Sequence, residues 1–193
     1  ATFAMSEALT IILKRNDPSA VAKQVSLTEL GSIKINKEER TQMLKAIPRN
    51  SVIGFLIGVL PGAGATIASF LAYGMERNFV SEEEKAKFGK GSVHGLTAPE
   101  TANNAACSGA FVPLLTLGIP GSGTTAVMLG ALLGFGIQPG PRLYITNPEI
   151  FWSVIMSMYI GMVILLILNL PLIPYIARIL AVPKNYLIPL ILF

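Results

Sequence analysis

The stretch from residue 50 to residue 75, NSVIGFLIGVLPGAGATIASFLAYGM, contains no charged side chain and is interrupted only at Pro61-Gly62-Ala63-Gly64. Two further stretches without charge cover residues 101–141 and residues 150–177. A helix that spans a bilayer needs about 20 predominantly apolar residues. Because each stretch is long enough, the sequence predicts an all-α, polytopic membrane protein.

The composition of the whole chain agrees with this prediction. Hydrophobic residues make up 52% of the 193 residues and charged residues only 13%, whereas a soluble domain carries about 25% charged residues. The mean hydropathy of +0.59 is far too high for a disordered chain. A large soluble protein with several buried helices is the less favoured alternative.

The residues of common active sites are scarce. Cys107 is the single cysteine, which excludes a disulfide framework and a zinc site built on cysteines. His94 is the single histidine, which makes a Ser-His-Asp enzyme a strained proposal, and we interpret it as a loop residue rather than a proton relay. The glycine-rich run 121–124 lacks the lysine of a phosphate loop. An enzyme is therefore the weakest of the function classes, and nucleic acid is not an expected partner.

Charged islands between the apolar stretches predict the topology. Residues 1–49 are expected to hold the end of a preceding helix and a basic loop, with a short surface helix at 37–47. Lysine and arginine accumulate on the cytoplasmic side of membrane proteins, so the loop is placed in the cytoplasm. Residues 50–193 then form the transmembrane region, with a span at 150–177. A last apolar run, residues 185–193, predicts a helix that is cut at the end of the sequence, so we expect a segment of a longer protein.

Residues 50–75 can be interpreted in two ways. One is a single spanning helix that is disrupted at Pro61-Gly62. The other is a re-entrant hairpin whose two arms, of about 11 residues each, reach about 17 Å into the bilayer. We favour the hairpin, because it returns the lysines of residues 76–90 to the cytoplasm.

An internal repeat marks the candidate site. Residues 60–66, LPGAGAT, parallel residues 119–125, IPGSGTT, and both follow and precede apolar runs. Proline and paired glycines break a helix, so broken helices are predicted at 61–64 and 120–123. Broken backbone inside a membrane is tolerated only where it is buried in protein or lines a wet cavity.

The helices that restart after these breaks, at Ala65 and Thr124, would offer free N–H groups and a partial positive charge to an anion. The flanking carbonyl groups suit a cation such as Na⁺. Two broken segments in corresponding positions are typical of a secondary-transporter site. The alternative is that the Pro-Gly pairs are only helix kinks or close packing points.

A polar run at residues 98–106 adds further candidates. Glu100, Asn103 and Asn104 occur at spacings i, i+3 and i+4, so a helix places them on one face. Polar groups in a membrane helix are costly and usually functional. The alternative is a helix-end charge with two asparagines that bond to a neighbouring helix.

These motifs resemble the large membrane subunit of the tripartite tricarboxylate transporter family (TctA-type). The similarity extends from about Phe3 to the end of the chain, and the N-terminal half of a family member, with its own Pro-Gly repeat, is missing. The strings that carry the resemblance are residues 54–73, 88–91, 98–100, 102–105, 113–122, 136–141, 158–161 and 169–172.

The resemblance implies a multi-pass protein of the bacterial inner membrane that imports citrate-like tricarboxylates or other organic acids. Uptake would be driven by a Na⁺ or proton gradient, together with a small membrane subunit and a periplasmic solute-binding protein. A channel or a structural membrane scaffold is the alternative function.

No catalytic residue is expected, and the only expected cofactor is Na⁺ as a coupling ion. Asn103, Asn104, Thr66 and Thr125 are the candidate Na⁺ ligands. The predicted substrate- and ion-binding residues are Gly62, Gly64, Thr66, Glu100, Asn103, Asn104, Gly121, Ser122, Gly123 and Thr125.

Overall fold

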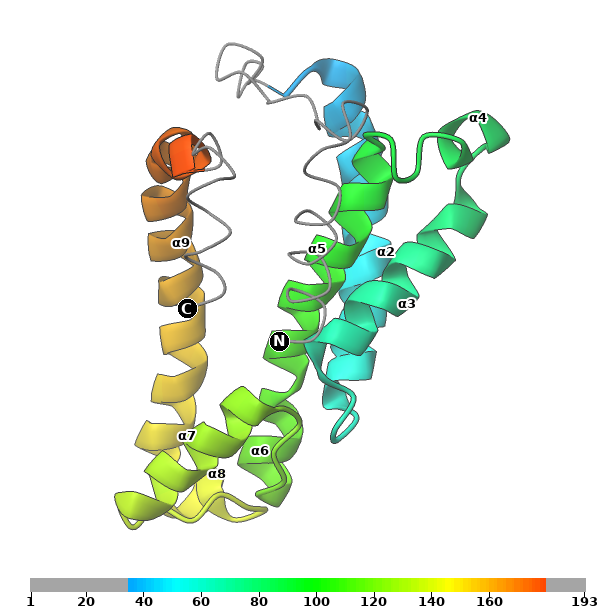
Figure 1. Ribbon diagram of the computed structural model, residues 1–193. Coiled ribbons are helices and arrows are strands. Elements are labelled where there is room, and N and C mark those ends of the chain that lie inside the picture. The colour runs from blue at the N-terminus through cyan, green and yellow to red at the C-terminus, as the bar shows by residue number, and fades with distance from the viewer. Residues whose placement is uncertain (1–34, 180–193) are drawn as a thin grey trace, which may run out of the picture. The chain divides into compact units, whose positions relative to one another are not determined.

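The computed structural model describes residues 35–179 (Figure 1). Every regular element in this range is a helix, which confirms the all-α prediction for the described residues. Residues 35–160 belong to one compact unit and residues 161–179 to another, so α9 contributes to both. The predicted elements within residues 1–34 and 185–193 lie outside the described residues. The helices are α2 (Lys37–Val59), α3 (Gly64–Phe79), α4 (Glu82–Lys85), α5 (Val93–Gly109), α6 (Phe111–Leu117), α7 (Gly123–Gly134), α8 (Leu143–Thr146) and α9 (Pro148–Ile179).

Helix α2 is longer than the sequence suggested. A capping box starts it, because Asn36 accepts a hydrogen bond from the Glu39 N–H and the Glu39 carboxylate accepts one from the Asn36 N–H. The helix then continues through Pro48 to Val59. The separate surface helix predicted at 37–47 is therefore wrong, and the predicted division at residue 49 falls inside one element.

The chain reverses direction after α2. Leu60–Ala63 form a turn, and α3 returns beside α2 so that Glu76, near the end of α3, contacts Arg49 in the middle of α2 (Figure 1). This is the geometry that the hairpin interpretation expects. The placement of the hairpin within a bilayer stays a prediction.

Small residues allow α2, α3 and α5 to approach closely. Gly54 and Gly58 face α5, where a Cβ added to either glycine would lie 2.3 Å and 2.2 Å from the carbonyl oxygens of Ala102 and Ala106. Ala68 and Ala72 of α3 are fully buried against the same alanines. Close packing of small residues is a usual way for helices to associate in membranes, where burial of apolar surface gives little driving force.

Two breaks separate the helices where the repeat predicts them. The first lies between α2 and α3, and the second lies between α6 and α7. The new helices begin at Gly64 and Gly123, one residue earlier than expected. Helix α6, which precedes the second break, is tied to the loop after α7, because the Gly140 N–H donates to the Leu115 carbonyl at 3.2 Å.

Helix α9 contains the span predicted at 150–177 and continues as a helix through Pro171. Among the described residues, its segment Pro148–Ile173 is the one helix that is both long and apolar enough to cross a membrane. Most of its large apolar side chains are exposed, as lipid contact requires. The structure thus supplies one candidate span, and it does not confirm the polytopic prediction.

The close contact between α2 and α5 predicts that Gly58→Ala is strongly destabilising. The new Cβ would overlap backbone atoms of Ala106, which cannot move as a flexible side chain can. We expect the free energy of unfolding to fall by about 1–3 kcal/mol, which would be measured as a lower midpoint temperature of thermal unfolding in detergent.

Gly74→Ala is the matched control, since it lies inside α3 with nothing within 4 Å of the added Cβ. It should leave the midpoint unchanged or raise it. Equal stability of the Gly58→Ala variant and the wild type would show that the α2–α5 contact is wrongly described.

Candidate functional site

A cavity of about 670 Å³ lies where the two Pro-Gly turns meet. Its volume is in the range of small-molecule sites, which is roughly 300–1,000 Å³. Both copies of the repeat contribute, so segments almost 60 residues apart in the sequence share one pocket. The lining residues are Gly62, Gly64, Ala65, Thr66, Cys107, Phe111, Pro120, Gly121, Ser122, Gly123, Thr124, Thr125 and Ala126.

The first turn of α3 presents free donors to this cavity. Its N-cap residue, Ala63, has helical backbone angles and makes no side-chain capping bond. The first N–H groups of a helix have no partner within the helix, and they carry the positive end of its dipole. Gly64, Ala65 and Thr66, which supply these groups, all line the cavity.

The first turn of α7 is capped by its own side chains. Ser122 accepts from the Thr125 N–H, and the Thr125 hydroxyl accepts from the Ser122 N–H at 2.8 Å. One residue explains the difference between the copies: Ser122 stands where the first copy has Ala63. The two similar turns are therefore unequal as anion sites, and the α3 turn is the more available one.

The lining of the cavity is uncharged. Hydroxyl groups of Ser122 and the threonines, together with backbone groups, are its polar components. The described residues contain no group of three or more His, Cys, Asp or Glu side chains that could hold a metal ion. Hydroxyl and carbonyl oxygens remain the possible Na⁺ ligands, and the Na⁺ site stays a prediction.

The predicted site residues of the two turns all line the cavity, whereas those of α5 do not. Asn103 lies one contact behind the wall, since its Nδ2 donates to Ser69 Oγ at 3.2 Å, and Ser69 Oγ donates to the carbonyl of the lining residue Ala65 at 3.0 Å. Glu100 and Asn104 lie on an exposed face of α5, where the Asn104 amide donates to the Glu100 carbonyl. The structure therefore separates Asn103 from the other two residues.

Two lining residues from the segment that joins α5 and α6 were missed by the sequence analysis. Cys107 follows Asn103 by one helical turn, and Phe111 follows Cys107 by another. The i+4 spacing from Asn103 was the signal that could have identified Cys107.

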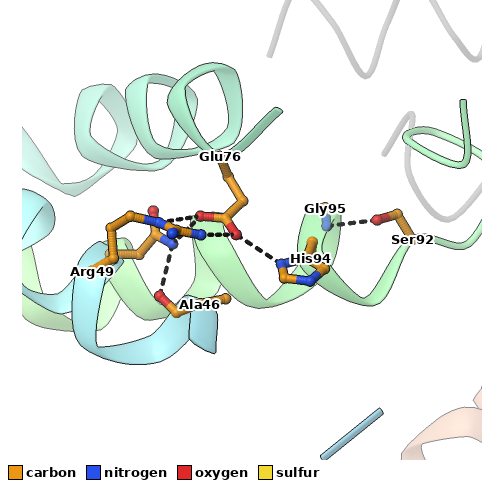
Figure 2. A network of polar contacts seen from close by, with 7 residues as sticks. Ala46, Arg49, Glu76, Ser92, His94 and Gly95 are labelled. Atoms are coloured by element: carbon orange, nitrogen blue, oxygen red, sulfur yellow. Dashed lines mark hydrogen bonds and ion pairs between the residues drawn. The ribbon is translucent and has the colours of Figure 1, made fainter. Parts of the chain in front are cut away.

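A buried network of polar side chains was also missed (Figure 2). The Glu76 side chain is fully buried, and each of its carboxylate oxygens accepts two hydrogen bonds. Arg49 binds both oxygens, with Nε at 3.0 Å from Oε2 and Nη2 on Oε1. Asn50 Nδ2 donates to Oε2 at 2.8 Å, and His94 Nδ1 lies 2.7 Å from Oε1.

His94 is therefore not a loop residue. It lies in the first turn of α5, where Ser92 is the N-cap, and it is 7% exposed. An ionised Glu76 requires the His94 proton to be on Nδ1. The predicted hairpin could have identified the ion pair in this network. Arg49 and Glu76 flank the uncharged stretch and lie equally far from its central turn, so a hairpin brings them side by side.

The network lowers the pKa of Glu76 below its ordinary value of 4.5. Burial acts in the opposite direction and is the largest single influence, but the hydrogen bonds from Arg49, Asn50 and His94, with the charge of Arg49, outweigh it. Glu76 is thus ionised at neutral pH. Its partner Arg49 also lies over the Phe79 ring, with the guanidinium carbon 4.4 Å from the ring centre.

The lowered pKa of Glu76 predicts an acid-sensitive fold. Its stabilising contribution is present above the unfolded-state pKa and is lost as the pH falls through the lower folded-state pKa. We expect the midpoint temperature of thermal unfolding in detergent to decrease as the pH is lowered from about 5 to about 3, which is the range around the ordinary pKa of carboxyl groups.

In Glu76→Gln this part of the pH dependence should disappear, and the protein should be less stable at pH 7. An unchanged difference between pH 5 and pH 3 in that variant would show that other carboxyl groups cause it.

Comparison with known proteins places the chain within a family. The sequence model described as "Tripartite tricarboxylate transporter TctA family" matches residues 1–193. An uncharacterized 52.8 kDa protein in the TAR-I ttuC' 3'region of Agrobacterium vitis is 39% identical over 177 residues, which cover 92% of this chain and 35% of that protein. An uncharacterized protein in the TAR-II ttuC' 3'region of the same organism is 46% identical over 138 residues, or 72% of this chain and 56% of that protein. The chain thus spans between about a third and just over half of these relatives, and no solved structure matches it.

Proposed function

The chain belongs to the tripartite tricarboxylate transporter TctA family, and from this premise we propose that it forms part of the substrate-binding region of a secondary active importer of organic acids. The substrates are citrate-like tricarboxylates or related carboxylates. The parent protein lies in the bacterial inner membrane as a multi-pass subunit, and it is a transporter rather than an enzyme. The observation that carries the proposal is the single cavity lined by both Pro-Gly turns.

The geometry suits a carboxylate. The free N–H groups of Gly64, Ala65 and Thr66 can donate to its oxygens, and the helix dipole favours its charge. Hydroxyl groups from the opposite turn can hold a second carboxylate. None of the described residues that line the cavity is acidic, so none of them would repel the ligand.

Transport also requires access from each side of the membrane in turn. Paired broken helices around a central site are the usual arrangement in secondary transporters. An ion gradient, of Na⁺ or of protons, would drive uptake, and the substrate would be delivered by a periplasmic solute-binding protein. A small membrane subunit completes the proposed assembly.

The first test is uptake of labelled citrate by the parent protein with its partners in proteoliposomes. Thr66→Val removes a hydroxyl from the cavity, and Asn103→Ala removes the hydrogen bond to Ser69 on the helix that forms one wall. We expect both variants to lower uptake by at least tenfold, as losing a polar contact of about 1.4 kcal/mol would.

Thr116→Val is the matched control for Thr66→Val. Thr116 is exposed on α6, its hydroxyl bonds only to the Val112 carbonyl, and it does not line the cavity. Normal uptake by both Thr66→Val and Asn103→Ala would show that the cavity is not the substrate site. Conductance without a gradient would favour a channel instead.

Cys107 provides a direct test of occupancy. It is the only cysteine of this chain, it is exposed, and it lines the cavity. In a parent protein without other cysteines, citrate should slow its alkylation by a maleimide. An equal concentration of choline, which carries the opposite charge, should not.

The concentration of citrate that halves the alkylation rate should match the half-saturating concentration for uptake. Alkylation that is indifferent to citrate, in a protein that transports it, would place the substrate elsewhere.

A further inference from the structure

The buried network around Glu76 lies outside the cavity, and the proposed function does not use it. Glu76 follows the lining residue Thr66 by ten residues on the same uninterrupted helix. This corresponds to a distance of about 15 Å along the helix axis. We propose that Glu76, Arg49 and His94 are positioning residues of the cavity, which fix α3 and thereby hold its free first turn opposite the α7 turn.

The need for such residues follows from the surface on which α3 packs. Its buried residues other than Glu76 are Ala68 and Ala72, which contact the equally small Ala102 and Ala106 of α5. Methyl groups permit a close approach, but they interlock little with the opposite helix. Small-residue packing alone therefore fixes the position of α3 along its axis only weakly.

Polar contacts fix the position of α3 that the small residues leave weakly determined. In the part of the chain that the structure describes, the side chains of α3 make polar contacts with other helices at two places, Ser69 and Glu76. At Glu76 the paired contact of Arg49 with both carboxylate oxygens sets direction as well as distance. Because the donors come from α2 and α5, one side chain locates α3 against both neighbours.

The two walls of the cavity depend to different degrees on the contacts that position α3. The α7 turn has its own support, namely the capping box of Ser122 and Thr125. The turn before α3 contains Gly62 and Gly64 at φ values of +80° and +68°, with nothing within 4 Å of an added Cβ. The position of that wall therefore depends on how α3 itself is held, at Ser69 close to the turn and at Glu76 near the other end of the helix.

Stability alone explains the network poorly. Buried ion pairs often stabilise a fold no better than apolar residues of the same size. Asn50 Oδ1 is also buried without a hydrogen-bond partner among the described residues, which is unfavourable. A positioning role explains why the chain keeps this energetically unfavourable network, because the network fixes the orientation of α3.

The experiment uses Cys107 as a reporter of cavity geometry and charge, so that no substrate is required. In the full-length parent protein without other cysteines, the labelling rates are measured with an anionic and a cationic methanethiosulfonate reagent. The ratio of these rates should favour the anionic reagent in the wild type, because Cys107 and the first turn of α3, at the positive end of its helix dipole, line the same cavity.

Arg49→Lys keeps the positive charge but loses the paired contact, and Glu76→Gln keeps the shape but loses the negative charge. Both should lower the ratio by about tenfold, which is the lower end of electrostatic effects on association rates. Thermal unfolding is measured for each variant, so that a folded but displaced α3 is distinguished from an unfolded protein.

Glu82→Gln is the matched control. It removes one exposed ion pair, with Lys85 at 2.9 Å on α4, and should leave the ratio unchanged. If Glu76→Gln does not fold, the Arg49→Lys and His94→Gln variants test the positioning role instead, because each keeps a hydrogen-bond donor near the Glu76 carboxylate.

Folded Arg49→Lys and His94→Gln variants with the wild-type ratio would overturn the positioning role. The inference rests on the proposed function, but its failure is separable. A wild type that shows no citrate protection would refute the substrate site, while the ratio of labelling rates would still report whether the network sets the cavity.

Discussion

Direct backbone contact between α2 and α5 is the constraint on which the rest of the described structure depends. Gly54 and Gly58 leave no room for a side chain at this contact, and alanines face them. The close approach brings α3 against the same surface, so that three helices share a core of methyl groups. Such a core depends on shape rather than on the amount of apolar surface that is buried, which is appropriate to a lipid environment.

This core has different roles at its two ends. At one end the chain turns through Pro61 and the glycines, and the new helix begins with free N–H groups beside the cavity. At the other end Glu76 accepts bonds from α2 and α5. One helix therefore joins a turn that lines the cavity to a buried charged network.

Much of the architecture was predictable because the membrane imposes simple requirements. Long uncharged stretches predicted the apolar helices, and proline with paired glycines predicted both breaks. The length of α2 was not predictable in this way, because a helix need not end where charged residues begin. The charged segment 37–49 continues the same helix, so the boundary drawn from charge was not a structural one.

The candidate site was only partly predictable, for similar reasons. The repeat identified the two turns that line the cavity, although their role as a substrate site remains a prediction. Helical spacing placed Glu100, Asn103 and Asn104 together, but only the neighbouring helix decides which of them points inward, and α3 lies beside Asn103. The Glu76 network depends on a tertiary contact between residues 27 positions apart, and short-range patterns do not report such contacts.

The difference between Ala63 and Ser122 has a stereochemical consequence. A pocket built from two identical turns would present the same environment to either end of a ligand. Here one turn is self-capped and the other is not, so the two halves of the pocket are chemically distinct. A ligand with two equivalent arms that lay across both turns would therefore have each arm in a different environment.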